Sequence, residues 1–244
     1  MVAHRTHGAL APTIAVAVVA IHLVPLALLL WWAGEDGGEL FFLAGVSLPL
    51  LLAIVAAQAL VLTPHRAGAG LVAPRSGALI WTLPPLAAAG ALLLVGADAA
   101  PDASPHLLLI LAGIVMAAAA EEITFRGAVF SVLAPRGELI AVLGSATIFG
   151  LAHMIAVVGG VAPAAAGSQA IGAFGFGLVL AVVRLRTGSL VGPVLIHIAW
   201  NIAVLSGDLR PGFLAEPLAA VLVIGVLLAA LVGMRARRRV ALGM

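Results

Sequence analysis

Two carboxylates and a guanidinium stand close together inside a long apolar stretch of the chain. The segment AEEITFRG contributes Glu121, Glu122 and Arg126. An ionisable side chain in such a stretch is costly unless it is paired or hydrated, so it is a candidate for function. On a helix Glu122 and Arg126 share a face and can pair, whereas Glu121 is rotated by about 100°. The carboxylates would then differ in environment, as acid–base chemistry requires. The structural alternative is an ion pair beside a helix-end carboxylate.

Two further pairs of residues, each containing a histidine, have the same spacing of four residues. In FGLAHM, Phe149 precedes His153, and the phenyl ring could pack beside the imidazole and restrict its rotamer. In HIAWN, His197 precedes Asn201, and both side chains could offer hydrogen bonds toward one point. Taken alone, each pair favours a structural role, such as a polar contact between membrane helices.

Together these residues have the chemistry of water activation. Glu121 could act as general base while His153 orients and polarises the water. His197 and Asn201 could donate hydrogen bonds to the oxyanion of a tetrahedral intermediate, which is the second requirement for hydrolysing a peptide bond. Alternatively, Glu121, His153 and His197 could bind a zinc ion with an open water position. The HExxH zinc motif is absent from the sequence, so ligands would have to come from different helices.

The elements that must position these residues are transmembrane helices. Of the 244 residues 64% are hydrophobic and 9% are charged, and the mean hydropathy is +1.24. A helix crosses the hydrocarbon core with about 20 apolar residues, and continuous apolar runs favour helices over strands. We therefore predict an all-α polytopic membrane bundle of about eight transmembrane helices, over Ala9–Trp32, Leu40–Leu62, Ala78–Gly96, Leu107–Phe130, Leu139–Gly159, Ser168–Leu185, Leu190–Leu205 and Leu214–Met234.

Arginine positions set the expected orientation. All twelve basic residues are Arg. Ten of them fall on one set of termini and connections, Arg126 lies inside a predicted span, and Arg210 alone falls on the opposite set. The positive-inside rule then places both termini in the cytoplasm of a multi-pass protein of the cell membrane. At about 1.5 Å per residue, Glu121, His153, His197 and Asn201 lie about 16, 21, 12 and 18 Å from the cytoplasmic ends of their helices. This common depth predicts one polar layer.

The ordered motifs resemble those of the CPBP family, which comprises type II CAAX prenyl endopeptidases and bacteriocin-processing enzymes. The similarity covers about Ala119 to Ala203 and includes the stretch TGSLVGPVLIH. The motifs E-E-x-x-x-R, F-x-x-x-H and H-x-x-x-N are carried by Glu121, Glu122, Arg126, Phe149, His153, His197 and Asn201.

This resemblance implies an eight-helix bundle of the Ras-converting CAAX protease type and an intramembrane endopeptidase. Glu121 and His153 would activate the water, Glu122 and Arg126 would shape the site, and His197 and Asn201 would stabilise the oxyanion. We expect no cofactor, with zinc as the alternative, since family members are described as both metal-independent and metal-dependent. The division would be helices 1–3 (residues 1–105), a catalytic core (106–210), and a last helix with a basic tail (211–244).

Other functions are compatible with parts of the pattern. A proton-coupled transporter also uses buried Glu and His, but no inverted repeat is visible. A non-catalytic immunity or binding protein would keep the motifs without turnover. The expected partners are the lipid bilayer and a peptide or membrane-anchored protein substrate. Nucleic acid is not indicated, the oligomeric state is open, and the absence of Cys excludes thiol chemistry. Structural roles are expected for the other polar residues of the spans, including His22, Ser145, Thr147 and Gln169.

Overall fold

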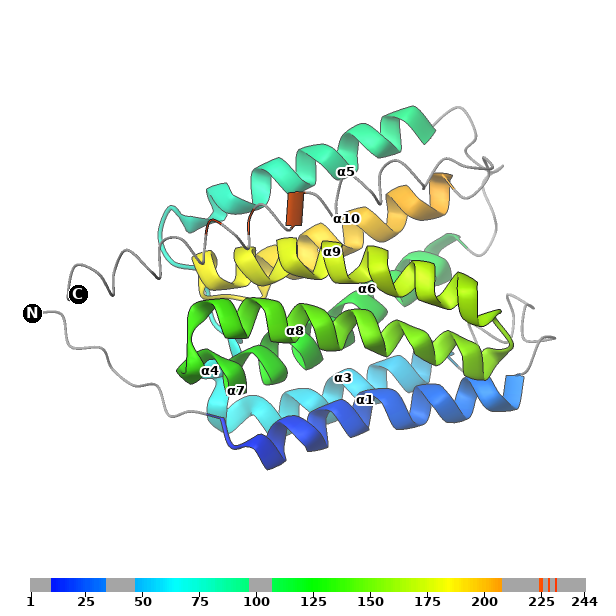
Figure 1. The fold of residues 1–244 in the computed structure, drawn as a ribbon, viewed down its shortest axis with the longest axis horizontal. Coiled ribbons are helices and arrows are strands. Elements are labelled where there is room, and N and C mark those ends of the chain that lie inside the picture. Colours follow the sequence, from blue (N-terminus) through cyan, green and yellow to red (C-terminus); the bar gives the residue numbers. More distant parts are fainter. Residues whose placement is uncertain are drawn as a thin grey trace, which may run out of the picture.

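A computed structural model describes residues 10–33, 47–96 and 107–207, together with residues 224, 225, 228 and 231. This part of the chain is 90% helical and contains no strand. The long helices run roughly side by side along one direction (Figure 1). The predicted all-α membrane bundle is thereby confirmed.

Fourteen helical elements occur in the described ranges. The order is α1 (Pro12–Ala33), α3 (Leu48–Leu62), η2 (Thr63–His65), α4 (Arg66–Ala69), η3 (Ala78–Thr82), α5 (Leu83–Gly96), α6 (Leu107–Glu122), η5 (Ile123–Val129), α7 (Phe130–Leu133), η6 (Ala134–Arg136), α8 (Glu138–Ala152), η7 (His153–Gly159), α9 (Pro163–Thr187) and α10 (Val191–Gly207).

Five helical stretches are long and apolar enough to cross a membrane. They span residues 12–31, 48–69, 107–136, 138–159 and 163–187, and two shorter apolar helices cover 78–94 and 191–204. The first seven predicted spans therefore correspond to helices, although residues 40–46 of the second lie outside the described ranges. The eighth predicted span and the basic tail also lie outside them, apart from four single residues.

Helix α9 is the central element of the bundle. Of the most apolar 18-residue segment of α9, 67% is buried inside the protein, compared with 17% of the corresponding segments in the spans that contain α1 and α3. It packs against α8, α10 and η7, while α1 with α3 and α5 with α10 form the two flanks (Figure 1). Gly150 of α8 allows close approach, because a Cβ there would lie 2.8 Å from the carbonyl oxygen of Ala170.

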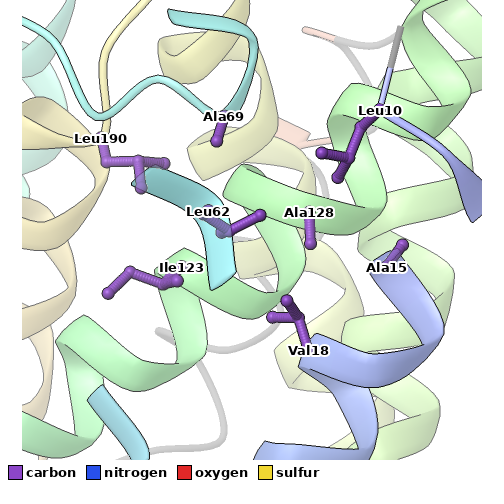
Figure 2. Close-up of a cluster of buried hydrophobic side chains, with 8 residues drawn as sticks. All are labelled: Leu10, Ala15, Val18, Leu62, Ala69, Ile123, Ala128 and Leu190. Atoms are coloured by element: carbon purple, nitrogen blue, oxygen red, sulfur yellow. The ribbon is translucent and has the colours of Figure 1, made fainter. Parts of the chain in front are cut away.

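A buried apolar cluster joins α1 to the middle of the bundle. Val18 of α1 points toward Ala128 of η5 (Figure 2), and Ala15, Leu62 of α3 and Ile123 of η5 belong to the same cluster. Water exclusion does not drive contacts between helices in lipid, so close packing must provide their stability. This contact fixes α1 against the segment that directly follows Glu121 and Glu122.

Candidate active site

Glu122 is the centre of a buried polar network. Its side chain is fully buried, and its Oε1 atom accepts a hydrogen bond of 2.9 Å from Arg126 Nη1. The same oxygen accepts a second bond of 2.9 Å from His197 Nδ1. The predicted pairing with Arg126 is present, and the sequence pattern had not indicated that His197 of α10 shares this carboxylate. A carboxylate with two charged or polar donors can stay ionised in a dry interior.

Arg126 holds several elements together around this carboxylate. Its guanidinium is fully buried, donates a 3.2 Å hydrogen bond from Nη2 to the carbonyl of Gly177 in α9, and lies 4.2 Å from the centre of the Phe149 ring. A Cβ at Gly177 would lie 3.1 Å from both Arg126 Nη2 and Phe149 Cδ1. Glycine at this position therefore leaves room for the guanidinium between α8 and α9.

The helix that carries the carboxylates changes its winding directly after Glu122. Residues Ile123–Val129 form a π-helical turn in which the Phe130 amide donates to the carbonyl of Phe125, five residues earlier. π-helical turns often occur at functional sites, and this one is buried along its whole length. The Arg126 carbonyl accepts a 3.2 Å bond from Arg184 Nε of α9, which anchors the turn from outside the helix.

Glu121 has a different environment from its neighbour, as the sequence predicted. Its side chain is 23% exposed, and its Oε2 lies 3.8 Å from His197 Nε2. That oxygen is buried and has no hydrogen-bond partner among the described residues. Glu122 is thus committed to Arg126 and His197, whereas Glu121 keeps an oxygen that can accept a proton.

His153 is fixed at the end of α8 by the residue one turn before it. Its Nδ1 donates a 2.9 Å hydrogen bond to the carbonyl of Phe149, and the two rings pack edge to face at 4.7 Å. Because a carbonyl only accepts, Nδ1 must carry the proton. In a neutral imidazole Nε2 is then an acceptor, suited to orient a water.

The bond to Glu122 likewise assigns the proton on His197 Nδ1. The opposite nitrogen, Nε2, is an acceptor when the ring is neutral and becomes a donor only in the imidazolium form. A neighbouring carboxylate stabilises an imidazolium, as in other carboxylate–histidine pairs. The aromatic rings of Phe149 and Phe176 lie edge-on to His197 at 5.9 and 5.3 Å and fix its plane.

A cavity of about 380 Å³ lies beside these two imidazoles. His153, His197 and Asn201 contribute to its wall, together with Gln169 of α9, for which only a structural role was expected. The remaining lining residues are Phe149, Ser168, Gly172, Ala173, Phe176, Trp200 and Val204. The cavity therefore combines apolar walls with a few polar groups, as small-molecule and peptide sites do.

Zinc binding would require Glu121, His153 and His197 to converge on one ion. In the ranges described, no three His, Cys, Asp or Glu side chains are close enough together to hold a metal ion. His197 Nδ1 is occupied by Glu122, and His153 Nδ1 by a backbone carbonyl. Zinc binding by Glu121, His153 and His197 therefore stays a prediction.

Two buried polar residues from outside the motifs also contact this region. Gln58 of α3 is fully buried and donates a 2.7 Å bond to Thr124 Oγ1. His22 of α1 is 4% exposed and lies edge-on to Phe125 at 6.0 Å. The depth argument could have found His22, since it lies 13 residues, about 20 Å, from the start of its predicted span.

A comparison with known families found one match. Residues 103–203 match the model of a family described as type II CAAX prenyl endopeptidase Rce1-like. The match includes every motif residue from Glu121 to Asn201 and confirms the resemblance to the CPBP family. At family level it supports a CPBP-type intramembrane protease. No curated protein and no solved structure matches the chain significantly.

Proposed function

We propose that this chain is an intramembrane endopeptidase that hydrolyses a peptide bond with a water activated by Glu121. Its substrates would be membrane-associated proteins or small peptides. The proposal is carried by the unequal environments of two adjacent carboxylates. Glu122 is fully buried and bonded to Arg126 and His197, whereas Glu121 Oε2 has no hydrogen-bond partner among the described residues and lies 3.8 Å from His197 Nε2.

The first step is attack by water on the substrate carbonyl. Glu121 accepts one proton from the water as the oxygen–carbon bond forms, and His153 Nε2 orients the water by accepting a hydrogen bond. Phe149 keeps His153 Nε2 available, because its carbonyl binds the opposite nitrogen. Glu121 lies just before the π-helical turn, and His153 is the first residue of η7. These two elements therefore position the groups that bind the water.

The carbonyl oxygen gains negative charge in this step. Donors already in place at that oxygen lower the barrier, because they need no reorganisation. Asn201 and protonated His197 Nε2 provide two such donors on the cavity wall. The tetrahedral intermediate collapses when the carbon–nitrogen bond breaks, and Glu121 returns its proton to the leaving amine.

The cavity is compatible with a short stretch of peptide. Its volume of about 380 Å³ is near the lower end for ligand pockets. Phe176 and Trp200 stack at 5.0 Å along one wall, and Gln169 provides a polar group for a substrate backbone. A substrate would bind by its extended backbone with apolar side chains on either side of the scissile bond.

The proposal is tested by comparing membrane proteomes, including protein N- and C-termini, of cells that express the wild-type protein or Glu121→Gln. We expect new termini only with wild type. Equal accumulation of both proteins is the control, measured by quantitative blotting of the membrane fraction. Identical termini at equal accumulation would reject proteolysis and favour a binding or transport role.

A further inference from the structure

His22 lies on the face of α1 that packs into the bundle. The buried positions of the described helix are Ala15, Val18 and His22, spaced by three and four residues, so they form one stripe. Ala15 and Val18 contact the cluster around Ile123 and Ala128 (Figure 2). His22 continues this stripe one turn further along α1.

That next turn reaches the predicted catalytic residues. Helix α1 packs against both η5, which follows the two glutamates, and η7, which begins at His153. The His22 ring lies edge-on to Phe125 at 6.0 Å, and Phe125 in turn packs against Phe149 at 5.1 Å.

Two buried polar atoms on these elements have no hydrogen-bond partner in the described ranges. One is His22 Nδ1 and the other is Glu121 Oε2. A buried polar atom left without a hydrogen bond is unfavourable, and in proteins a bound water commonly satisfies two such atoms at once. A histidine nitrogen that carries its proton and a carboxylate oxygen offer a water one donor and one acceptor.

We propose that His22 is a positioning residue of the same site, where it and Glu121 hold one water between His22 Nδ1 and Glu121 Oε2. This inference rests on the proposed peptidase function and adds a residue from α1, outside the segment 103–203 that matches the family. His22 would fix the Glu121 carboxylate and the water that it deprotonates. It contacts neither the scissile bond nor the leaving group.

Substitutions at His22 distinguish the contribution of each ring nitrogen from the contribution of the packed ring. An Asn side chain places its amide near the position of Nδ1, whereas Gln places it near Nε2. We expect His22→Gln and His22→Phe to lower kcat about 10- to 100-fold, as positioning residues around a reactive centre do, with little change in KM. His22→Asn should retain most of the activity. His65→Asn, in the η2 turn, is the matched control for loss of an imidazole.

The result that overturns the proposal is equally defined. If Asn, Gln and Phe at position 22 all retain wild-type kcat, His22 has no role at the site. If all three reduce kcat in proportion to a loss of thermal stability, its role is packing of α1 alone. Either outcome leaves the peptidase function intact, as long as wild type cleaves and Glu121→Gln does not.

A second measurement does not depend on activity. Nitrogen-15 NMR of histidine-labelled protein in detergent reports the state of each His22 nitrogen, with the signals assigned by their loss in His22→Asn. We expect Glu121→Gln to shift the Nδ1 signal of His22 and to leave that of His65 unchanged. An unchanged His22 signal would overturn the proposal even if the peptidase function failed.

Discussion

At the residue scale, the site depends on the different tasks of two adjacent carboxylates. Glu122 accepts hydrogen bonds from Arg126 and His197, and the Arg126 guanidinium also covers the Phe149 ring. One buried cluster thus fixes the imidazole of His197 and the ring that supports His153. Glu121 Oε2 has no hydrogen-bond partner among the described residues and lies 3.8 Å from His197 Nε2; in the proposed mechanism it accepts the proton of the attacking water.

We expect Arg126→Ala to destabilise the protein by about 3–5 kcal/mol, the cost of breaking a buried ion pair by removing one partner. Glu122 would keep only its hydrogen bond from His197, and the Phe149 ring would lose its contact with the guanidinium. Unfolding in detergent with increasing denaturant measures this loss. Arg136→Ala, which removes an exposed guanidinium bonded to the Val132 carbonyl, is the control.

A double mutant tests whether the loss arises from the pair itself. Glu122→Gln combined with Arg126→Ala should lose less stability than the sum of the two single variants, because neither charge is then left alone. Strict additivity of the two losses would contradict the pairing.

Spacing alone predicted part of this arrangement. Glu122 and Arg126 are four residues apart on one helix, so their contact follows from helix geometry, and the same holds for Phe149 and His153. The bond between Glu122 and His197 joins residues 75 positions apart. It depends on how α6 and α10 are rotated about their axes, which a spacing within one helix does not contain.

At the element scale, close packing of α9 positions the guanidinium. Gly177 accepts the Arg126 hydrogen bond through its carbonyl, and its missing side chain leaves room for Phe149 as well. A Cβ there would also lie 3.2 Å from the Cα of Ala146, a backbone atom that cannot move independently of α8.

We therefore expect Gly177→Ala to push α8 and α9 apart, to displace Arg126, and to lower both the midpoint of thermal unfolding and the cleavage rate. Overpacking of this kind typically costs about 1–3 kcal/mol. Gly167→Ala is a matched control on the same helix, because a Cβ at Gly167 would meet no atom within 4 Å. Equal effects of the two substitutions would contradict this account of α9.

The elements themselves were largely predictable, but their winding was not. Apolar runs predicted the long helices because each needs enough residues to cross the lipid. The π-helical turn at Ile123–Val129 and the tight 3₁₀ turns at His153–Gly159 were not predicted. Hydropathy does not distinguish them from α-helix, and contacts such as that of Arg184 with the Arg126 carbonyl hold them in place.

At the scale of the whole molecule, the arginine distribution predicts which end of the bundle faces the cytoplasm. Helix α4 lies at one end of the bundle, and the junction between η7 and α9 lies at the other (Figure 1). Ala67 in α4 and Ala162 in that junction are both exposed. The two positions therefore report on opposite sides of the membrane.

Because the native sequence has no Cys, single cysteines can be labelled without background. We expect a membrane-impermeant thiol reagent, applied to intact cells, to label Ala162→Cys and to leave Ala67→Cys unlabelled until the membrane is opened. The reverse pattern would show that the protein is inverted. Labelling of both positions in intact cells would contradict a fixed transmembrane orientation.

The arrangement of helices as neighbours could not be predicted from the sequence. The distances from the helix ends predicted that Glu121, His153, His197 and Asn201 lie at a similar depth in the membrane. Many different arrangements of neighbouring helices are compatible with that depth. Small residues such as Gly150 and Gly177 and the buried stripe of α1 determine which helices meet. His22 enters the site in this way, from a helix that carries no family motif.

The central claim is that Glu121 activates the water that breaks a peptide bond. Its most direct test is the cleavage rate of purified wild type and Glu121→Gln, with and without a chelator, on a peptide that spans a cleavage site found in the proteome comparison. We predict that Glu121→Gln lowers the rate about 10²- to 10⁴-fold, while the wild-type rate is unaffected by the chelator. Wild-type activity in Glu121→Gln would contradict the role of Glu121, and a chelator-dependent loss restored by zinc would contradict the metal-independent mechanism.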